Sequence, residues 1–164
     1  MKQESVIQKG IEAAKRISAN GIEPIGKEEA MRKARELVER CEVAMVGSHG
    51  TDGYPNIKAM FKEGAQGLKI VCFSTGGSSR RVAQFRSNPK SCVYFFDSTV
   101  YEGVMLTGDI EIVDDLEAKR RLWRDGWEAY YPQGVTDPEY CMLRFTARWG
   151  NYYHDLQNVS FDMD

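Results

Sequence analysis

The sequence predicts an α+β protein that is mainly β, built as a small antiparallel barrel with helical covers. Five to seven short runs of β-forming residues, separated by turn residues, lie between positions 42 and 156, and the first three follow one another in hairpin order. Helical patterns fill the first 41 residues and interrupt the strands after the third and after the fifth. A doubly wound α/β fold is disfavoured, because it needs strands that alternate regularly with long helices.

Composition limits the possible partners. The chain has 164 residues, a net charge of −2 and a pI near 5.8, so it lacks the broad basic surface that holds nucleic acid. Charged residues recur at short intervals near the N-terminus, beginning with Lys2 and Glu4. We therefore expect no signal peptide and no membrane span.

The cysteines are far apart in the sequence, form no Cys-x-x-Cys pair and have no histidine nearby, so we expect neither a metal site nor a disulfide framework. Free thiols suit a reducing compartment, which favours the cytoplasm. The four are Cys41, Cys72, Cys92 and Cys141.

Residues 1–41 are predicted to form a helical segment that packs on the barrel. Apolar residues recur at helical spacing from Val6 to Ile17, and Asn20-Gly21 supplies a stop. A second helix is expected over residues 27–40, with its apolar residues on one face and its charged residues mostly opposite.

Residues 42–156 are predicted to form the barrel itself. The first three strands are expected over residues 43–47, 54–61 and 68–73. In the second strand, Lys58, Met60 and Lys62 share one face, so antiparallel pairing is expected to bring Lys58 or Lys62 near the end of the third.

The later strands are expected over residues 92–96, 101–113, 142–147 and 152–154. Gly103 and Gly108 mark bends or bulges, and Asp114-Asp115 caps a further helix. Gly150 is expected to turn the chain toward the short closing strand. Residues 157–164 are predicted to be a loose tail, and all three parts form one domain.

The stretch over residues 73–89 has the features of an anion cradle. A Ser-Thr-Gly-Gly turn ends the third strand, Ser78 or Ser79 then caps a helix, and Asn-Pro stops that helix. Arg80 and Arg81 lie in its first turn, where the helix dipole is already positive. A bound anion offsets the unfavourable placement of these two positive charges. The hydroxyl groups of four residues can add hydrogen bonds to a phosphate: Ser74, Thr75, Ser78 and Ser79. The alternative is an ordinary strand, turn and helix with solvated arginines.

The order of these motifs resembles the FMN-binding split barrels related to pyridoxamine 5′-phosphate oxidase, particularly the general-stress-protein branch. In that family the turn, a Ser-Arg-Lys motif and a helix ending in Asn-Pro bind the phosphate of FMN; here Ser79-Arg80-Arg81 stands at the motif, with Arg81 where lysine is usual. The family's preceding strand carries an arginine motif at the place of Lys58-Ala59-Met60, which contacts phosphate and flavin ring. Lysine offers a point charge in place of the planar arginine fork.

The resemblance extends over several weaker motifs in the same order, among them Leu122-Trp123 and Asp137-Pro138. It implies a split β-barrel and a homodimer with each FMN at the interface between two barrels. Oxidases of pyridoxamine phosphate usually have a glutamine near the position of Gly103 and an Arg- and Trp-containing C-terminal segment, both absent here. Oxidation of vitamin B6 is therefore disfavoured, but flavin binding is still expected.

Two functions follow from the resemblance. The first is an FMN-dependent oxidoreductase that acts on a small molecule, with a nicotinamide donor reducing the flavin; FMN then supplies the hydride chemistry, and no catalytic side chain is assigned. The second is a non-catalytic flavin-binding or stress protein. A barrel that holds haem or a deazaflavin is a third possibility, disfavoured by the intact cradle. His49 and His154 lack partners that would form a triad or a metal set, so structural or surface roles are expected.

Overall fold

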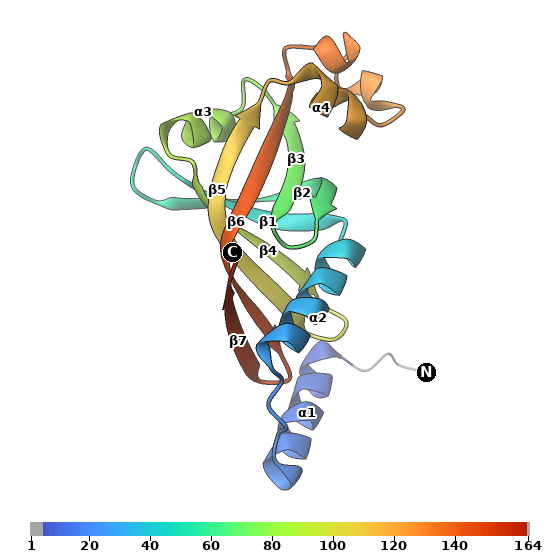
Figure 1. Ribbon diagram of the computed structural model, residues 1–164, viewed down its shortest axis with the longest axis vertical. Coiled ribbons are helices and arrows are strands. Elements are labelled where there is room, and N and C mark those ends of the chain that lie inside the picture. Colours follow the sequence, from blue (N-terminus) through green and yellow to red (C-terminus); the bar gives the residue numbers. More distant parts are fainter. Residues whose placement is uncertain (1–4, 164) are drawn as a thin grey trace.

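In the computed structural model, which describes residues 5–163, six antiparallel strands close into a barrel and a seventh extends it (Figure 1). The strand order is β3-β2-β1-β4-β5-β6-β7, and pairing of β3 with β6 closes the ring. The predicted α+β barrel is therefore confirmed. The strands are β1 (Val43–His49), β2 (Pro55–Gln66), β3 (Ile70–Gly76), β4 (Lys90–Asp97), β5 (Glu102–Val113), β6 (Tyr140–His154) and β7 (Gln157–Asp162).

Four α-helices accompany the barrel within the described residues. Each begins or ends close to the position that its sequence signals predict, and Ser79 and Asp115 act as side-chain caps of the third and fourth. Two short 3₁₀ turns, η1 (Trp127–Ala129) and η2 (Gly134–Thr136), follow the last helix. The helices are α1 (Val6–Asn20), α2 (Lys27–Arg40), α3 (Arg80–Ser87) and α4 (Leu116–Leu122).

The two N-terminal helices are held very differently. Four residues of α2 are completely buried, and they belong to the same hydrophobic cluster as the barrel interior: Ala30, Ala34, Leu37 and Val38. In contrast, α1 has no buried residue. Its links to the rest of the chain include the hydrogen bond from Lys9 Nζ to the carbonyl of Thr99 and a shallow apolar cavity shared with Tyr101, Tyr153 and Leu156. Thus α2 covers the core, whereas α1 lies on the surface (Figure 1).

The prediction of a turn at Gly150 is wrong, because β6 runs without interruption through this position. Gly150 pairs with Leu106 on one side and with Phe161 on the other. A Cβ at Gly150 would lie 2.4 Å from the ring of Phe161, so glycine serves here to let that ring approach the strand. The chain turns only at Asp155 and Leu156, which both have positive φ.

The predicted loose tail is also wrong over residues 157–162, which form β7 along the edge of β6. Polar residues alternate with apolar ones in this strand, and the apolar Phe161 is only 2% exposed. Its burial in the core anchors the strand. Residues 1–4 and 164 lie outside the described residues. The structure therefore does not test the predictions that involve Lys2, Glu4 or the last residue.

An ionic cluster joins the end of α2 to the barrel. The Arg40 guanidinium contacts both Glu102 and Asp97, and the Tyr152 hydroxyl donates to Glu102 Oε1 at 2.6 Å. Glu102 is 8% exposed, and these partners satisfy its buried carboxylate oxygens. No helix within residues 5–163 is both long and apolar enough to cross a lipid bilayer.

Candidate functional site

The start of α3 is positioned by a close approach between two loops. β3 pairs with β6 up to Gly76, opposite Tyr140, and the amide of Gly77 donates to the Glu139 carbonyl at 2.9 Å. A Cβ on Gly77 would lie 2.6 Å from the carbonyl oxygen of Pro138, so a side chain would collide with backbone. The two glycines therefore bring the chain into α3 at a fixed place against the end of β6.

Arg81 is the centre of the candidate anion site. Its Nη1 donates to Thr75 Oγ1 at 3.1 Å, and burial lowers the pKa of the guanidinium. No carboxylate among residues 5–163 forms an ion pair with Arg81. The amides of Arg80 and Arg81, in the first turn of α3, also have no backbone acceptor among the described residues. A half-buried cation beside two free amides and a hydroxyl is a binding arrangement for an anion such as a phosphate.

The other predicted residues near α3 have different partners. Ser79 Oγ accepts from the amide of Val82 as the helix cap. Ser78 donates to Glu139 Oε2 from both its amide and its hydroxyl, at 3.2 and 2.8 Å. Arg80 is exposed, and its Nη2 lies 3.9 Å from Asp52 Oδ2. Thr75, Ser79 and Arg81 therefore gather at the start of α3, whereas Ser78 and Arg80 each face a carboxylate.

The predicted residues of β2 lie apart from this group. Lys58 pairs with Val46 of β1 and is exposed, and no hydrogen bond or ion pair within the described residues links it to α3. Ala59 is exposed on the outer face, while Met60 is 5% exposed and belongs to the core. The part of these three residues in the site stays a prediction.

The expectation that Lys62 adds a third cation to the cradle is wrong. Lys62 does pair with Phe73, next to Ser74, but its amino group donates to the carbonyls of Val38 and Glu39 at the end of α2. These carbonyls lack partners in the helix, and the negative end of the helix dipole attracts the ammonium group. Burial lowers the pKa of Lys62 in this position.

A second polar site, which the sequence did not reveal, lies on the other side of β3. Ser74 Oγ donates to Glu63 Oε1 at 3.0 Å, and Glu63 is among the residues around a cavity of about 380 Å³. Ser74 and Thr75 are consecutive in a strand, so their side chains point to opposite faces. Glu63 carried no motif in the sequence; only its proximity to Ser74 across the β2–β3 pair could have pointed to it.

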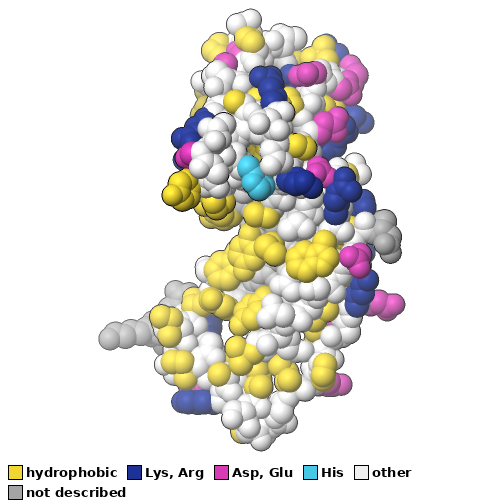
Figure 2. Space-filling model, turned by 90° about the vertical axis from the view of Figure 1, so that its left-hand side faces the viewer, with side chains coloured by type: hydrophobic (Ala, Val, Ile, Leu, Met, Phe, Trp, Pro, Cys, Tyr) yellow, Lys and Arg dark blue, Asp and Glu magenta, His cyan; other side chains and the backbone are white. Residues whose placement is uncertain are grey.

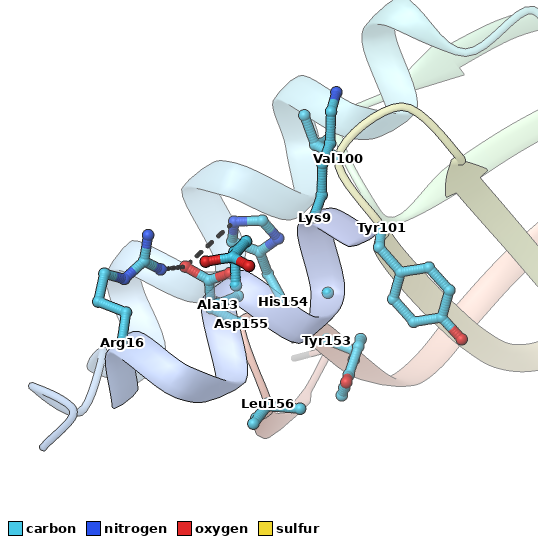
Figure 3. Close-up of a pocket in the computed structure, with 11 residues that line it drawn as sticks. Lys9, Ala13, Arg16, Val100, Tyr101, Tyr153, His154, Asp155 and Leu156 are labelled. Atoms are coloured by element: carbon cyan, nitrogen blue, oxygen red, sulfur yellow. Dashed lines mark hydrogen bonds and ion pairs between the residues drawn. The ribbon is translucent and has the colours of Figure 1, made fainter. Parts of the chain in front are cut away.

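The histidines take no part in either site. His49 is exposed at the end of β1. His154 lines a cavity of about 550 Å³ beneath α1, where its Nε2 lies 3.7 Å from Asp155 Oδ2 and Arg16 pairs with the same carboxylate at 2.9 Å (Figure 3). This cavity shares no residue with the start of α3 or with the cavity at Glu63.

Gly103, where the sequence departs from the oxidase pattern, is covered by Tyr94. A Cβ at Gly103 would lie 2.2 Å from the Tyr94 hydroxyl oxygen. The tyrosine of β4 therefore fills the space that a longer side chain on β5 would need.

Comparison with known proteins agrees with this architecture. A family model described as pyridoxamine 5′-phosphate oxidase matches residues 30–154. The chain is 47% identical to a Clostridium acetobutylicum protein related to general stress protein 26 of B. subtilis, of the pyridoxinephosphate oxidase family. The match has a TM-score of 0.78 and covers 85% of this chain and 98% of that one. No curated protein matches the chain.

Two more distant structures share the fold alone. General stress protein 26 from Bacillus anthracis is 14% identical with a TM-score of 0.67, covering 80% of this chain and 98% of that one. A heme binding protein from Mycobacterium smegmatis is 15% identical with a TM-score of 0.67, covering 86% of this chain and 59% of that one. The family match spans most of the chain and the close structural match spans nearly all of its relative. The chain therefore belongs to the pyridoxamine 5′-phosphate oxidase family, in its general-stress-protein branch.

Proposed function

We propose that the start of α3 binds the phosphate of FMN and that the protein is an FMN-dependent oxidoreductase acting on a small molecule. The observation that carries this proposal is Arg81, a half-buried guanidinium whose pKa burial lowers and which has no carboxylate partner among the described residues. A phosphate group carries about two negative charges, which offset the unfavourable burial of the Arg81 guanidinium. Family membership supports flavin as the source of the phosphate.

The residues present fit the phosphate end of FMN. Arg81 and Thr75 supply side-chain donors, and the amides of Arg80 and Arg81 add backbone donors at the positive end of the helix. Lys58 is exposed on β2 and adds positive charge. In the arrangement that the resemblance implies, the backbone at Ala59 and Met60 borders the flavin ring. When bound, FMN supplies hydride transfer, and the protein supplies orientation and electrostatics.

We propose a homodimer, because the outer face of β1, β2 and β4 exposes a continuous row of apolar side chains. Val43 pairs with Phe61 across β1 and β2, and Met45 lies opposite Tyr94 of β4. Phe61 is 72% exposed, which is a high value for a residue in the middle of a strand. Figure 2 shows hydrophobic side chains gathered over the middle and lower part of one face of the molecule. Contiguous apolar patches of this kind mark interaction sites.

The first test is the visible absorption spectrum of the purified protein, followed by titration with FMN. A two-banded flavin spectrum released as FMN on denaturation is expected. Arg81→Ala should then weaken FMN binding by about 1.5–3 kcal/mol, or roughly 10- to 150-fold, because it removes a charge-assisted hydrogen bond. Arg80→Ala is the matched control, since that guanidinium is exposed and near Asp52, and it should cost less than about 1 kcal/mol.

Three results would change the proposal. A colourless protein that takes up no FMN would overturn it, and a haem-like or deazaflavin spectrum would keep the fold and replace the cofactor. If the protein binds FMN tightly but a nicotinamide donor reduces the bound FMN no faster than free FMN, the non-catalytic flavin-binding function is favoured. The free thiols of the described chain suit the reducing cytoplasm, where we place this activity.

A further inference from the structure

The cavity beside Glu63 lies where the barrel meets the aromatic segment after α4. It has a volume of about 380 Å³, which is within the usual range for small-molecule sites. It is lined by residues of β2 and β3 and by residues in and around η1. The lining residues are Phe61, Glu63, Ser74, Arg124, Trp127, Tyr130 and Tyr131.

The two charged residues of this cavity are paired with each other. Arg124 Nε lies 3.0 Å from Glu63 Oε2, and Ser74 Oγ donates to the other carboxylate oxygen at 3.0 Å. The Glu63 side chain is 1% exposed, and its Oε2 is buried. A ligand therefore cannot reach this carboxylate, and the ion pair leaves the cavity without net charge.

Arg124 keeps hydrogen-bond donors that a ligand can reach. Its side chain is 57% exposed, and Nη2 donates to the Lys62 carbonyl at 3.1 Å. No hydrogen bond or ion pair within residues 5–163 involves Nη1. A guanidinium group has five N–H donors, so an acceptor atom of a ligand can still bind here. The carboxylate beside it reduces the attraction of this arginine for a second anion.

Aromatic rings form most of the remaining lining. Trp127 and Tyr131 lie 6.3 Å apart at 66°, and both pack on Tyr140, which is 1% exposed and holds them in place. Phe61 and Tyr130 are 72% and 76% exposed, so their rings lose contact with water when an apolar molecule enters the cavity. Phe61 also borders the apolar face that we propose for the homodimer.

We propose that this cavity binds an uncharged aromatic molecule that carries a hydrogen-bond acceptor, such as a carbonyl or carboxamide oxygen. Its ring lies against Trp127 and Tyr131, and its acceptor receives a hydrogen bond from Arg124. A cation finds no reachable acceptor on Glu63, and an anion meets an arginine that is already paired. A phosphate ester, with about two negative charges, is the least favourable ligand. Naming the bound molecule as the substrate rests on the proposed function, but its binding does not.

Benzamide, benzoate and benzamidine are the probes, because they share a nearly identical planar shape and carry no charge, one negative charge and one positive charge. Their affinities are measured by calorimetry at about pH 8 on FMN-loaded and FMN-free protein. We expect benzamide to bind about fivefold or more tightly than either charged probe, because only the charged probes lose hydration without an available counter-charge. Trp127→Leu should weaken the binding of all three.

Variants of the ion pair test the role of charge. Glu63→Gln keeps the shape of the side chain and releases Arg124 from its carboxylate, so benzoate should bind about tenfold more tightly than before, while benzamide changes little. Arg124→Met removes the donor and should weaken benzamide about fivefold or more. Glu111→Gln, which changes an exposed carboxylate on β5, is the control and should leave all three affinities unchanged.

Equal or tighter binding of benzoate or benzamidine than of benzamide would overturn the proposal, and this comparison needs no variant. An unchanged benzoate affinity in folded Glu63→Gln protein would also overturn it. The flavin spectrum is read separately. Absence of benzamide binding to a protein that holds FMN refutes the aromatic site alone, and benzamide binding by a protein that takes no FMN refutes the flavin proposal alone. Benzamide binding to the FMN-free form only would overturn the assignment of the ligand as a substrate.

Discussion

Replacing Arg40 with methionine tests whether the ionic cluster at the end of α2 holds that helix to the barrel. Arg40 is the last residue of α2, and its guanidinium contacts Glu102 and Asp97, which lie at opposite ends of the β4–β5 connection. The Tyr152 hydroxyl of β6 donates to the other oxygen of Glu102. Methionine keeps most of the length and apolar stem of arginine and removes only its charge and donors.

The burial of Glu102 and the exposure of Arg40 set the expected loss in the free energy of unfolding. Removing one partner of a buried ion pair costs about 3–5 kcal/mol, because the remaining charge is left without compensation. Glu102 is 8% exposed, but the Arg40 side chain is 41% exposed and Tyr152 still donates to the carboxylate in the variant. We therefore expect a smaller loss of about 2–3 kcal/mol in the free energy of unfolding. For a chain of this length that corresponds to a decrease of roughly 5–10 °C in Tm.

Equilibrium denaturation in urea measures the loss, with an unchanged slope m showing that the unfolding transition is the same. The matched control is Arg144→Met, since the ion pair of Arg144 with Glu111 is 41% and 62% exposed on its two sides. This variant should lose less than about 1 kcal/mol. If Arg40→Met were no less stable than Arg144→Met, the cluster would contribute nothing beyond a surface ion pair, and the reasoning from burial would be refuted.

Three further predictions concern single side chains. Phe161→Ala should cost about 3–5 kcal/mol in urea denaturation, because the ring is 2% exposed in the core; a loss below about 1 kcal/mol would mean that β7 is loosely held. Gly103→Ala should cost about 1–3 kcal/mol through its clash with the Tyr94 ring, and a Tyr94→Ala background should reduce this penalty; equal penalties in both backgrounds would contradict the contact. Burial raises the pKa of Glu63 above its ordinary value despite Ser74 and Arg124, so the folded state binds this proton more tightly than the unfolded state. The stability contribution of Glu63 should therefore fall as pH rises from the ordinary glutamate range through the raised pKa, and this part of the pH profile should vanish in Glu63→Gln.

The helices could be predicted from the sequence because their limits are set locally. Ser79 and Asp115 cap their helices through bonds to residues two or three positions away, and Asn88 stands at the end of α3 where Asn-Pro predicts a stop. The edge strand β7 could not be predicted in this way. Its stability comes from pairing with β6 and from the burial of Phe161, and neither is visible in the composition of a short polar segment.

The sequence analysis found the parts of the candidate site whose positions depend on backbone geometry. It missed the parts that depend on how far a side chain reaches or on the strand register. Thr75 and Arg81 come together because a strand, a glycine turn and a capped helix follow directly in the chain. Alternation placed Lys62 on the face toward the cradle, but its long side chain reaches the free carbonyls of α2. A register shift in β2 between Lys62 and Gly64 then breaks the alternation at Glu63, so no period-two pattern could indicate that this carboxylate is buried.

The end of β3 therefore separates two opposite charges with a single strand. Thr75 bonds the cation Arg81 on the side of α3, and Ser74 bonds the carboxylate Glu63 on the side of α4. A phosphate is attracted by Arg81, which has no carboxylate partner among the described residues, whereas Arg124 lies 3.0 Å from Glu63 and offsets its charge. The two sides of β3 therefore differ in net charge, and this difference favours an anion on the side of α3. Because Glu63 lies on the opposite side of β3 from Arg81, Glu63→Gln should leave phosphate binding at Arg81 in place.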